Sequence, residues 1–342
     1  MAEISGIHKE RAKLGKILPL STPYTLNIFI TSYCNFKCNY CFHTLPKAER
    51  IEKYGPLTHM SLETFRATID SLKNFPNKLK TILISGHGEP LLNPHVSEMV
   101  RYAVQSNMSE RVEIITNASV LTHELSDALI EAGLNYLRVS VQGISAEKYK
   151  AISGVDIDFE RFVEQLRYFY KRKKGYNCKV YCKTMDVALD EGEEAVFYKL
   201  FQDICDIINI EKAVVFDEDV EYHGMERAKL SKNKNSTFGG GIAVCPIPFY
   251  TVDVFQDGLI SPCHVRNNIT LGDVQTIGVY NAWNSLECRN LWLQLLSKEG
   301  WNRCCTCHFK DGLLKDGDDI DLYRSEIAKK IRDAEKICPA AE

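Results

Sequence analysis

Thr31-Ser-Tyr-Cys34-Asn-Phe-Lys-Cys38-Asn-Tyr-Cys41-Phe-His43 places three cysteines near the N-terminus in a C-x3-C-x2-C spacing. Three thiolates at this spacing can bind three irons of a 4Fe-4S cluster, which leaves the fourth iron open to a substrate or cofactor. His43 could instead complete a four-ligand zinc site, so the spacing by itself leaves zinc as an alternative. An open iron favours catalysis over simple electron storage.

Composition limits the kind of protein that carries this triplet. The chain has 342 residues, 45% of them hydrophobic and 25% charged, with a net charge of −3, which gives no sign of a nucleic-acid or membrane partner. The N-terminus lacks the apolar core of an export signal, and no apolar run reaches the ~20 residues that span a bilayer. We therefore expect a cytoplasmic protein, in which the thirteen cysteines serve metal or cluster binding rather than disulfides.

The order of apolar and amphipathic segments predicts the fold. We expect strands at 25–31, 79–85, 112–116, 136–141, 179–184 and 213–216, and helices at 61–72, 96–105, 124–132, 159–171 and 194–204. Such β/α alternation is typical of a parallel sheet. The prediction is an α/β fold, a partial (β/α)6 TIM-like barrel.

Polar and glycine-rich segments fall at the ends of the expected strands. The cysteine triplet follows the first strand, and Gly86-His-Gly88-Glu89-Pro90 follows the second. Asn117, Ser140 and Gln142 stand at later strand ends. Because functional loops lie at the carboxyl ends of parallel strands, we expect all of these residues in one site.

The pattern changes after residue 217. A polar, glycine-rich stretch at 231–241 precedes two strands around Gln256-Asp-Gly258, which is a hairpin signal, and a helix near 286–296. These elements predict a small C-terminal domain, a β-hairpin plus a helix. We expect four parts: an N-terminal extension (1–24), the barrel (25–230), this smaller domain (231–322) and a C-terminal helix or tail (323–342).

The N-terminal part resembles the radical S-adenosylmethionine (SAM) enzymes. The matching features are the triplet with Tyr40 before its last cysteine, and Gly88-Glu89-Pro90 after the second strand. The resemblance implies that Cys34, Cys38 and Cys41 bind a 4Fe-4S cluster and that SAM chelates the open iron. The SAM contacts that it implies are Tyr40, Phe42, Gly88, Glu89, Pro90, Asn117, Ser140 and Gln142.

A second group of cysteines follows in the C-terminal part. Cys245, Cys263, Cys304 and Cys307 make a four-thiolate set that suits a structural zinc as well as a cluster. The segment resembles the short form of the SPASM domain, called a twitch domain. This resemblance implies that the part at 231–322 is a small C-terminal iron–sulfur domain that binds an auxiliary 4Fe-4S cluster. Cys305 or Cys338 could replace one of the four ligands.

The resemblance also implies the chemistry. SAM is cleaved to methionine and a 5′-deoxyadenosyl radical, which abstracts a substrate hydrogen, and a reductant such as flavodoxin or ferredoxin supplies the electron. Only 33 residues precede Cys34, fewer than a leader-binding domain needs. This favours dehydrogenation of a carbohydrate or cyclitol-type small molecule, as in 2-deoxy-scyllo-inosamine dehydrogenase-type enzymes, with the auxiliary cluster as electron acceptor.

Three alternatives stay open. One is a peptide- or protein-modifying enzyme of the sulfatase-maturation or ribosomal-peptide type. Another is a sugar epimerase, in which a non-ligand thiol returns a hydrogen atom; Cys178 and Cys182 are the candidates for this catalytic role. The third is a non-catalytic interaction protein with two zinc sites.

Overall fold

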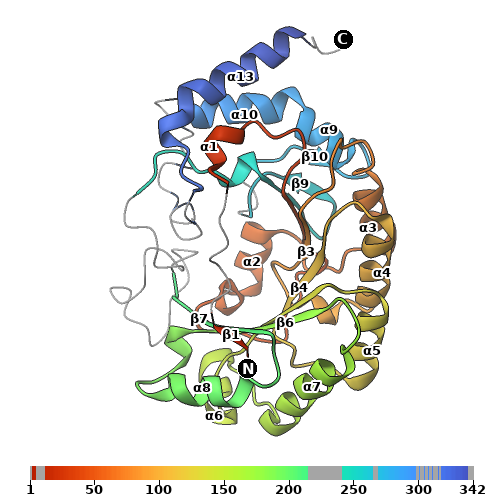
Figure 1. Ribbon diagram of the computed structural model, residues 1–342, viewed down its shortest axis with the longest axis vertical. Helices are drawn as coiled ribbons and strands as arrows, with labels where there is room; N and C mark the ends of the chain where they lie inside the picture. Colours follow the sequence, from red (N-terminus) through yellow and green to blue (C-terminus); the bar gives the residue numbers. More distant parts are fainter. Residues whose placement is uncertain are drawn as a thin grey trace.

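One continuous sheet contains strands from both cysteine-bearing parts of the chain. The computed structural model describes residues 2–4, 12–214, 241–264, 269–297 and 317–337, together with the single positions 300, 304, 307, 310 and 315. The sheet has ten strands in the order β1-β7-β6-β5-β4-β3-β2-β8-β9-β10. Figure 1 shows it curving through the molecule with helices along its outer side.

The parallel series forms the partial barrel that the sequence predicts. Its strands are β2 (Thr25–Ile28), β3 (Thr81–Ile84), β4 (Val112–Thr116), β5 (Tyr136–Ser140), β6 (Lys179–Met185) and β7 (Ile207–Glu211), each paired in parallel with the next. The helices between them are α2 (Lys47–Tyr54), α3 (Leu62–Asp70), α4 (Val96–Ser106), α5 (His123–Glu131), α6 (Ala146–Ser153), α7 (Phe159–Arg172) and α8 (Glu193–Phe201).

Local sequence explains these elements. Buried β-branched and leucine side chains fill the strands, as at Leu26, Ile84 and Ile114, which have no exposed surface. Helices begin at side chains that accept a backbone N–H: Ser61 accepts from Thr64 at the start of α3. The alternation predicted from the sequence is confirmed for the first five strands.

The sixth predicted strand is wrong. The sequence places it at 213–216, whereas the structure places β7 at Ile207–Glu211. Val214 forms an isolated bridge, and 215–216 lie outside the described residues. The prediction followed the apolar run at 213–216, which is the stronger hydrophobic signal. Strand β7 gives a weaker signal because it contains Asn209 and Glu211, and part of its surface faces the polar interior of the barrel.

The C-terminal part extends the same sheet. Strand β8 (Thr251–Val254) pairs in parallel with β2, β9 (Leu259–Ser261) pairs antiparallel with β8, and β10 (Gly272–Asp273) pairs with β9. The predicted hairpin and the helix at 286–296 are confirmed. The helices of this part are α9 (Gly278–Asn284), α10 (Leu286–Leu296) and α13 (Arg324–Ile337), and α13 packs on α10 (Figure 1).

Short elements complete the described chain. Near the N-terminus, β1 (Glu3–Ile4) pairs with β7, and α1 (Leu14–Ile17) lies close to the 3-10 turn η6 (Asp321–Tyr323). The other 3-10 turns are η1 (Phe42–Thr44), η2 (Pro90–Leu92), η3 (Asp186–Ala188) and η5 (Ile247–Phe249). The predicted linker at 231–240 lies outside the described residues, and the four-part division of the chain stays a prediction.

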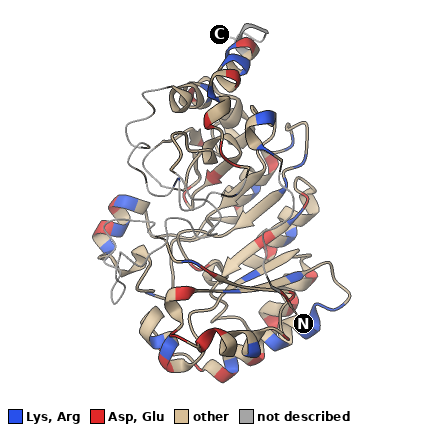
Figure 2. Ribbon diagram, turned by 60° about the vertical axis from the view of Figure 1, so that its left-hand side comes forward, with Lys and Arg blue, Asp and Glu red and all other residues tan. Residues whose placement is uncertain are grey.

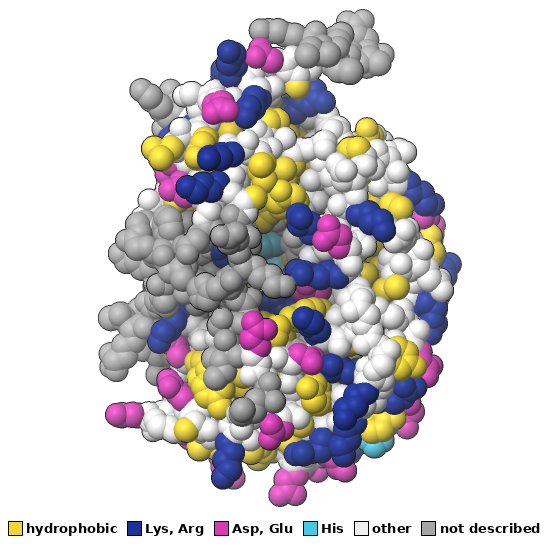
Figure 3. Space-filling model, in the orientation of Figure 1, with side chains coloured by type: hydrophobic (Ala, Val, Ile, Leu, Met, Phe, Trp, Pro, Cys, Tyr) yellow, Lys and Arg dark blue, Asp and Glu magenta, His cyan; other side chains and the backbone are white. Residues whose placement is uncertain are grey.

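Acidic and basic residues are interspersed along the outer helices (Figure 2). The face seen in Figure 3 mixes both signs with small hydrophobic patches. None of the described helices has the length and apolar character needed to cross a bilayer.

Trp283 provides a test of how the C-terminal helices stabilise the barrel. Its side chain is 1% exposed, and its indole N–H donates to the carbonyl of Leu20 at 3.2 Å. Because Trp283→Ala leaves a large cavity, we expect the free energy of unfolding to fall by about 3–5 kcal/mol. The measurement is the urea midpoint of the purified protein.

Leu286→Ala is the control, because Leu286 is 54% exposed at the start of α10. We expect a change below about 0.5 kcal/mol for this surface substitution. Equal urea midpoints for Trp283→Ala and the unmodified protein would contradict the proposed packing role.

Candidate functional site

A pocket of about 190 Å³ lies at the carboxyl ends of the parallel strands. Every strand from β2 to β7 contributes to its wall, either directly or through the loop that follows it. The lining residues are Cys34, Phe36, Cys38, Tyr40, Cys41, Gly86, Gly88, Glu89, Ile115, Thr116, Asn117, Ser140, Val141, Gln142, Lys183, Thr184, Met185 and Glu211. The fold therefore brings the cysteine triplet together with most of the expected SAM contacts.

The cysteine loop is fixed through its own backbone. Lys37 N–H donates to the Ser153 carbonyl at 2.9 Å, and Asn39 N–H donates to the Ile152 carbonyl at 2.8 Å, so the loop is tied to the end of α6. Phe36 is buried against Tyr149. Because backbone hydrogen bonds and aromatic packing hold this loop, its three cysteine side chains are available to line the pocket.

The donor set fits an iron–sulfur cluster. Burial raises the pKa of the Cys34 thiol to about 12. The pKa of Cys38 is also raised, by burial and then by the charges of Cys41 and Cys34, so the three sulfurs are near neighbours. Thiols in such surroundings ionise when a metal centre compensates their charge. The described side chains form no compact group for a single metal ion; a four-iron cluster instead takes each thiolate on a separate iron.

The turn after β3 fits closely against this loop. A side chain at Gly88 would place its Cβ 2.4 Å from the Tyr33 carbonyl oxygen and 2.6 Å from that of Thr31, so glycine is required there. The Glu89 N–H donates to the Tyr33 carbonyl at 2.8 Å. The turn and the cysteine loop therefore hold each other in place.

The Glu89 carboxylate joins this turn to the end of β4. Its oxygens accept hydrogen bonds from Asn117 N–H at 2.6 Å, from Leu91 N–H at 3.0 Å and from the Thr116 hydroxyl. Burial raises the pKa of Glu89 to about 7, and the three donors partly offset that effect. The Glu89 carboxylate therefore lines the pocket and also connects the turn after β3 to the end of β4.

The remaining expected contacts divide into two groups. Tyr40 donates its hydroxyl proton to Gln142 Oε1, and the Gln142 amide donates to the Ser140 carbonyl at 3.0 Å, so these three form one wall. Phe42 and Pro90 are absent from the lining: Phe42 stacks on Tyr54 with ring centroids 4.0 Å apart, and Pro90 begins η2.

Four lining residues at the ends of β6 and β7 were missed in the sequence: Lys183, Thr184, Met185 and Glu211. Lys183 Nζ lies 2.8 Å from Glu211 Oε2. Their position at strand ends could have identified these residues, because the same reasoning predicted Ser140. Glu211 was missed because the last strand was predicted at the wrong position.

Hydrogen bonds between histidines connect the two cysteine-bearing loops. His43, two residues after Cys41, donates from Nε2 to the His87 carbonyl at 2.8 Å, because its Nδ1 accepts from Arg50. The His87 ring bonds the carbonyl of His264 at 3.2 Å, next to Cys263. Burial lowers the pKa of His43 to about 4, so its ring is neutral.

The second cysteine group is partly described. Burial raises the pKa of Cys245 to about 12, and the charges of Cys304 and Cys307 add to the rise, so these three thiols lie near one another. Cys263 follows β9, and its N–H donates to the Ser261 hydroxyl at 3.2 Å. Cys305 and Cys338 lie outside the described residues, so the ligand set stays a prediction.

Cys178 and Cys182, the candidate hydrogen donors, are not on the pocket wall. Both are buried, and Cys182 is hydrogen bonded to Cys205 on the side of β6 that faces the helices. The structure therefore does not bring either thiol to the triplet.

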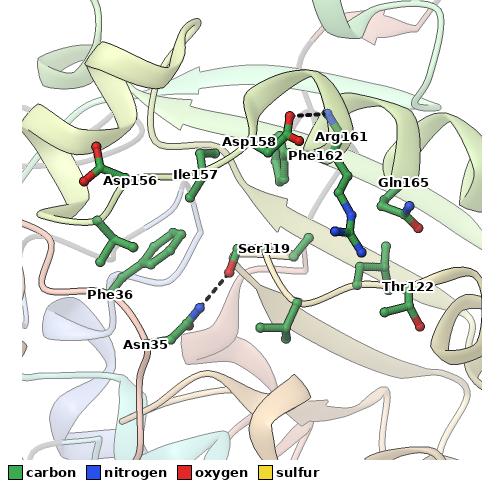
Figure 4. Close-up of a pocket in the computed structure, with 14 residues that line it drawn as sticks. Asn35, Phe36, Ser119, Thr122, Asp156, Ile157, Asp158, Arg161, Phe162 and Gln165 are labelled. Atoms are coloured by element: carbon green, nitrogen blue, oxygen red, sulfur yellow. Dashed lines mark hydrogen bonds between the residues drawn. The ribbon is translucent and has the colours of Figure 1, made fainter.

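A larger pocket, of about 350 Å³, lies beside the cysteine loop between α7 and the loop that precedes α5 (Figure 4). Asn35 donates to the Ser119 hydroxyl at 2.8 Å across its floor, and the N–H of Arg161 donates to Asp158 at 3.0 Å. Its wall contains none of the cysteines, so we place the chemistry in the smaller pocket.

Comparison with known families agrees with this geometry. The Radical SAM superfamily profile matches residues 28–194, and the profile of an iron-sulfur cluster-binding domain, SPASM, matches residues 245–308. A radical SAM domain binds a 4Fe-4S cluster and SAM, and a SPASM domain binds a further iron–sulfur cluster.

Individual relatives share part of the sequence. The AdoMet-dependent heme synthase of Methanosarcina barkeri is 30% identical over 185 residues, which are 50% of this chain and 48% of that protein. A GTP 3′,8-cyclase of Pasteurella multocida is 29% identical over 39% of this chain and 37% of its own length. The chain thus spans less than half the length of these two relatives.

Solved structures share the fold. The enzyme anSMEcpe with bound AdoMet superposes with a TM-score of 0.56 and 18% identity, covering 92% of this chain and 98% of that one. BtrN in complex with AdoMet and 2-DOIA gives a TM-score of 0.51 and 16% identity, covering 83% and 92%. At these identities the likeness establishes the fold.

His87→Phe tests the histidine connection. The His87 ring stacks on Phe29 with ring centroids 4.8 Å apart. Phenylalanine can keep this stacking but loses the hydrogen bond to His264. Loss of one hydrogen bond of about 1 kcal/mol predicts roughly fivefold faster amide exchange in residues 259–264. Hydrogen-exchange mass spectrometry measures this, with β5 as the internal reference that keeps its rate. Unchanged exchange at 259–264 would show that the bond does not hold this loop.

Proposed function

We propose that this chain, which contains a radical SAM domain followed by an iron-sulfur cluster-binding SPASM domain, dehydrogenates a carbohydrate-like or cyclitol-type small molecule. A bound cluster and SAM would supply the chemistry: one electron would cleave SAM to methionine and a 5′-deoxyadenosyl radical able to take a hydrogen atom from the substrate. Completing an alcohol oxidation would then release a proton and one electron from the substrate, and we assign that electron to the auxiliary cluster.

One observation carries this proposal: the three cysteines of the triplet line the same pocket as the glycine turn and the polar strand ends. We assign Cys34, Cys38 and Cys41 to the first cluster. Gly88 lets the turn approach that loop closely, and Glu89 fixes the turn to β4. These residues would hold and orient a bound cofactor.

The polarity of the pocket favours a polar small-molecule substrate. Polar side chains at the ends of β5, β6 and β7 line it together with the cysteines. BtrN, whose structure contains 2-DOIA, shares the fold. A reductant such as flavodoxin or ferredoxin is the implied partner.

The runner-up is modification of a peptide or protein. It is favoured by anSMEcpe, which shares the fold and whose structure was also obtained with the Cp18Cys peptide. An epimerase is disfavoured because Cys178 and Cys182 are absent from the pocket wall. A non-catalytic zinc-binding interaction protein is disfavoured by the two family matches.

Metal analysis tests the cofactor content. After anaerobic purification and reconstitution we expect about eight irons and as many acid-labile sulfides per chain, as two four-iron clusters require. About four irons, with stoichiometric zinc, would assign the second cysteine group to zinc. That result would remove the electron acceptor from the proposal.

Two substitutions separate the roles of the clusters. Cys34→Ala is expected to abolish 5′-deoxyadenosine formation from SAM under reducing conditions, because it removes a ligand of the first cluster. Cys263→Ala is expected to retain SAM cleavage while losing net substrate oxidation. Chromatography of the reaction products measures both.

Cys288→Ala is the control, since Cys288 is a buried thiol in α10 and belongs to neither cysteine group; we expect it to retain both activities. Complete loss of SAM cleavage in both Cys34→Ala and Cys263→Ala, with both proteins folded, would contradict an electron-acceptor role for the second cluster.

A further inference from the structure

A buried ion pair forms part of the pocket wall opposite the cysteines. Lys183 stands near the end of β6 and Glu211 at the end of β7, with Nζ and Oε2 2.8 Å apart. Their side chains are 12% and 3% exposed. Both residues line the pocket together with Cys34, Cys38 and Cys41.

Strand register places this pair at the level of the expected SAM contacts. Ser140 on β5 is directly opposite Lys183 on β6, and Met185 is opposite Glu211 on β7. Side chains alternate along a strand, and Cys182 points to the helices, so Lys183 points into the barrel. Three neighbouring strands thus present polar groups to one space.

The pair is not needed to hold the two strands together. Five residue pairs already register β6 with β7 through backbone hydrogen bonds. Moving two charges out of water is costly, and apolar residues of similar size often stabilise a protein as well as a buried ion pair does. Apolar side chains such as Ile115 and Val141 occupy other parts of the same wall. We therefore look for the role of this charged pair in binding a ligand in the pocket.

The chemistry of the pair defines what it can bind. An ammonium has three donors and a carboxylate about four acceptor positions, which is more than a single bond between the two groups uses. Adjacent hydroxyl groups, or a hydroxyl beside an amine, offer an acceptor for the lysine and a donor for the glutamate. The two charges cancel, which disfavours a phosphate or carboxylate that would approach Glu211.

We propose that Lys183 and Glu211 together bind two vicinal polar groups of the substrate, a diol or an amino alcohol, and so set which carbon faces the cofactor. This inference rests on the proposed function and narrows its substrate class to neutral or aminated polyols. It assigns specificity to the ends of β6 and β7, away from the residues that hold the first cluster.

The test uses the reconstituted, reduced holoenzyme with SAM, and myo-inositol and glucosamine as probes. Cyclohexanol serves as a probe with a single hydroxyl, and a serine-containing octapeptide represents the peptide class. We expect either polyol to raise the rate of 5′-deoxyadenosine formation, and cyclohexanol and the peptide to leave it unchanged. Calorimetric titration of the polyol into SAM-bound holoenzyme measures binding separately from turnover.

Lys183→Met is expected to weaken the polyol response and polyol binding by about 10- to 100-fold, the loss of one hydrogen bond to a charged group. Because it leaves Glu211 buried without its lysine, Lys183→Met/Glu211→Leu removes both charges and guards against misfolding. Lys173→Met is the control: Lys173 pairs with Asp206 at 2.9 Å and is 11% exposed, but lies outside the pocket. We expect it to behave as the unmodified enzyme.

The outcomes separate the two proposals. Failure of the unmodified holoenzyme to form any 5′-deoxyadenosine overturns the proposed function, and this inference with it. Formation of 5′-deoxyadenosine without a response to either polyol overturns this inference alone. The same holds if both Lys183 variants keep the polyol response, or if cyclohexanol or the octapeptide matches the polyols.

Discussion

The candidate site depends on the contact between two strand-end loops, the cysteine loop after β2 and the glycine turn after β3. The contact has no room for a side chain at Gly88, whose Cβ would meet the backbone of Thr31 and Tyr33. The N–H of Glu89 bonds the Tyr33 carbonyl, and its carboxylate bonds the backbone at Asn117. Three consecutive strands are therefore locked at their carboxyl ends by one glycine and one buried acid. The three thiols can face the pocket because the backbone of their loop is held by hydrogen bonds to α6 and to the glycine turn.

The sequence predicts well whatever depends on local pattern. Alternation of apolar and amphipathic segments located five of the six parallel strands, the hairpin and α10, and strand-end position located Asn117, Ser140 and Gln142 in the pocket. Local pattern failed at β7, whose Glu211 faces a polar interior and so breaks the expected apolar run. The family resemblance implied Phe42 as a SAM contact, yet its ring stacks on Tyr54. Side-chain direction in a loop is set by packing partners that are distant in sequence.

The pairing of β8 with β2 is the non-local event that joins the two cysteine groups. Register places Thr251 opposite Thr25, so the hairpin that precedes Cys263 continues the barrel sheet beside the strand that precedes Cys34. His87 then spans the two loops, with Phe29 and Phe255 packed against its ring. Spacing between cysteines contains no information about this arrangement, because 222 residues separate Cys41 from Cys263. The proposed transfer of an electron from the substrate to the auxiliary cluster depends on this sheet pairing, because the pairing brings the second cysteine group to the barrel.

The residues proposed to hold the cofactor and those proposed to bind the substrate lie on different strands. The strands β2, β3 and β4 support the cysteines, Gly88 and Glu89, whereas β6 and β7 contribute Lys183 and Glu211. Curvature of the sheet turns these two ends toward the same pocket, so the groups proposed to hold the cofactor and those proposed to hold the substrate share one space (Figure 1). The Glu89 carboxylate accepts hydrogen bonds from Leu91, Thr116 and Asn117, on the side of β3 and β4. On the proposed assignment, side chains on β6 and β7 could therefore differ between substrates while these hydrogen bonds stay in place.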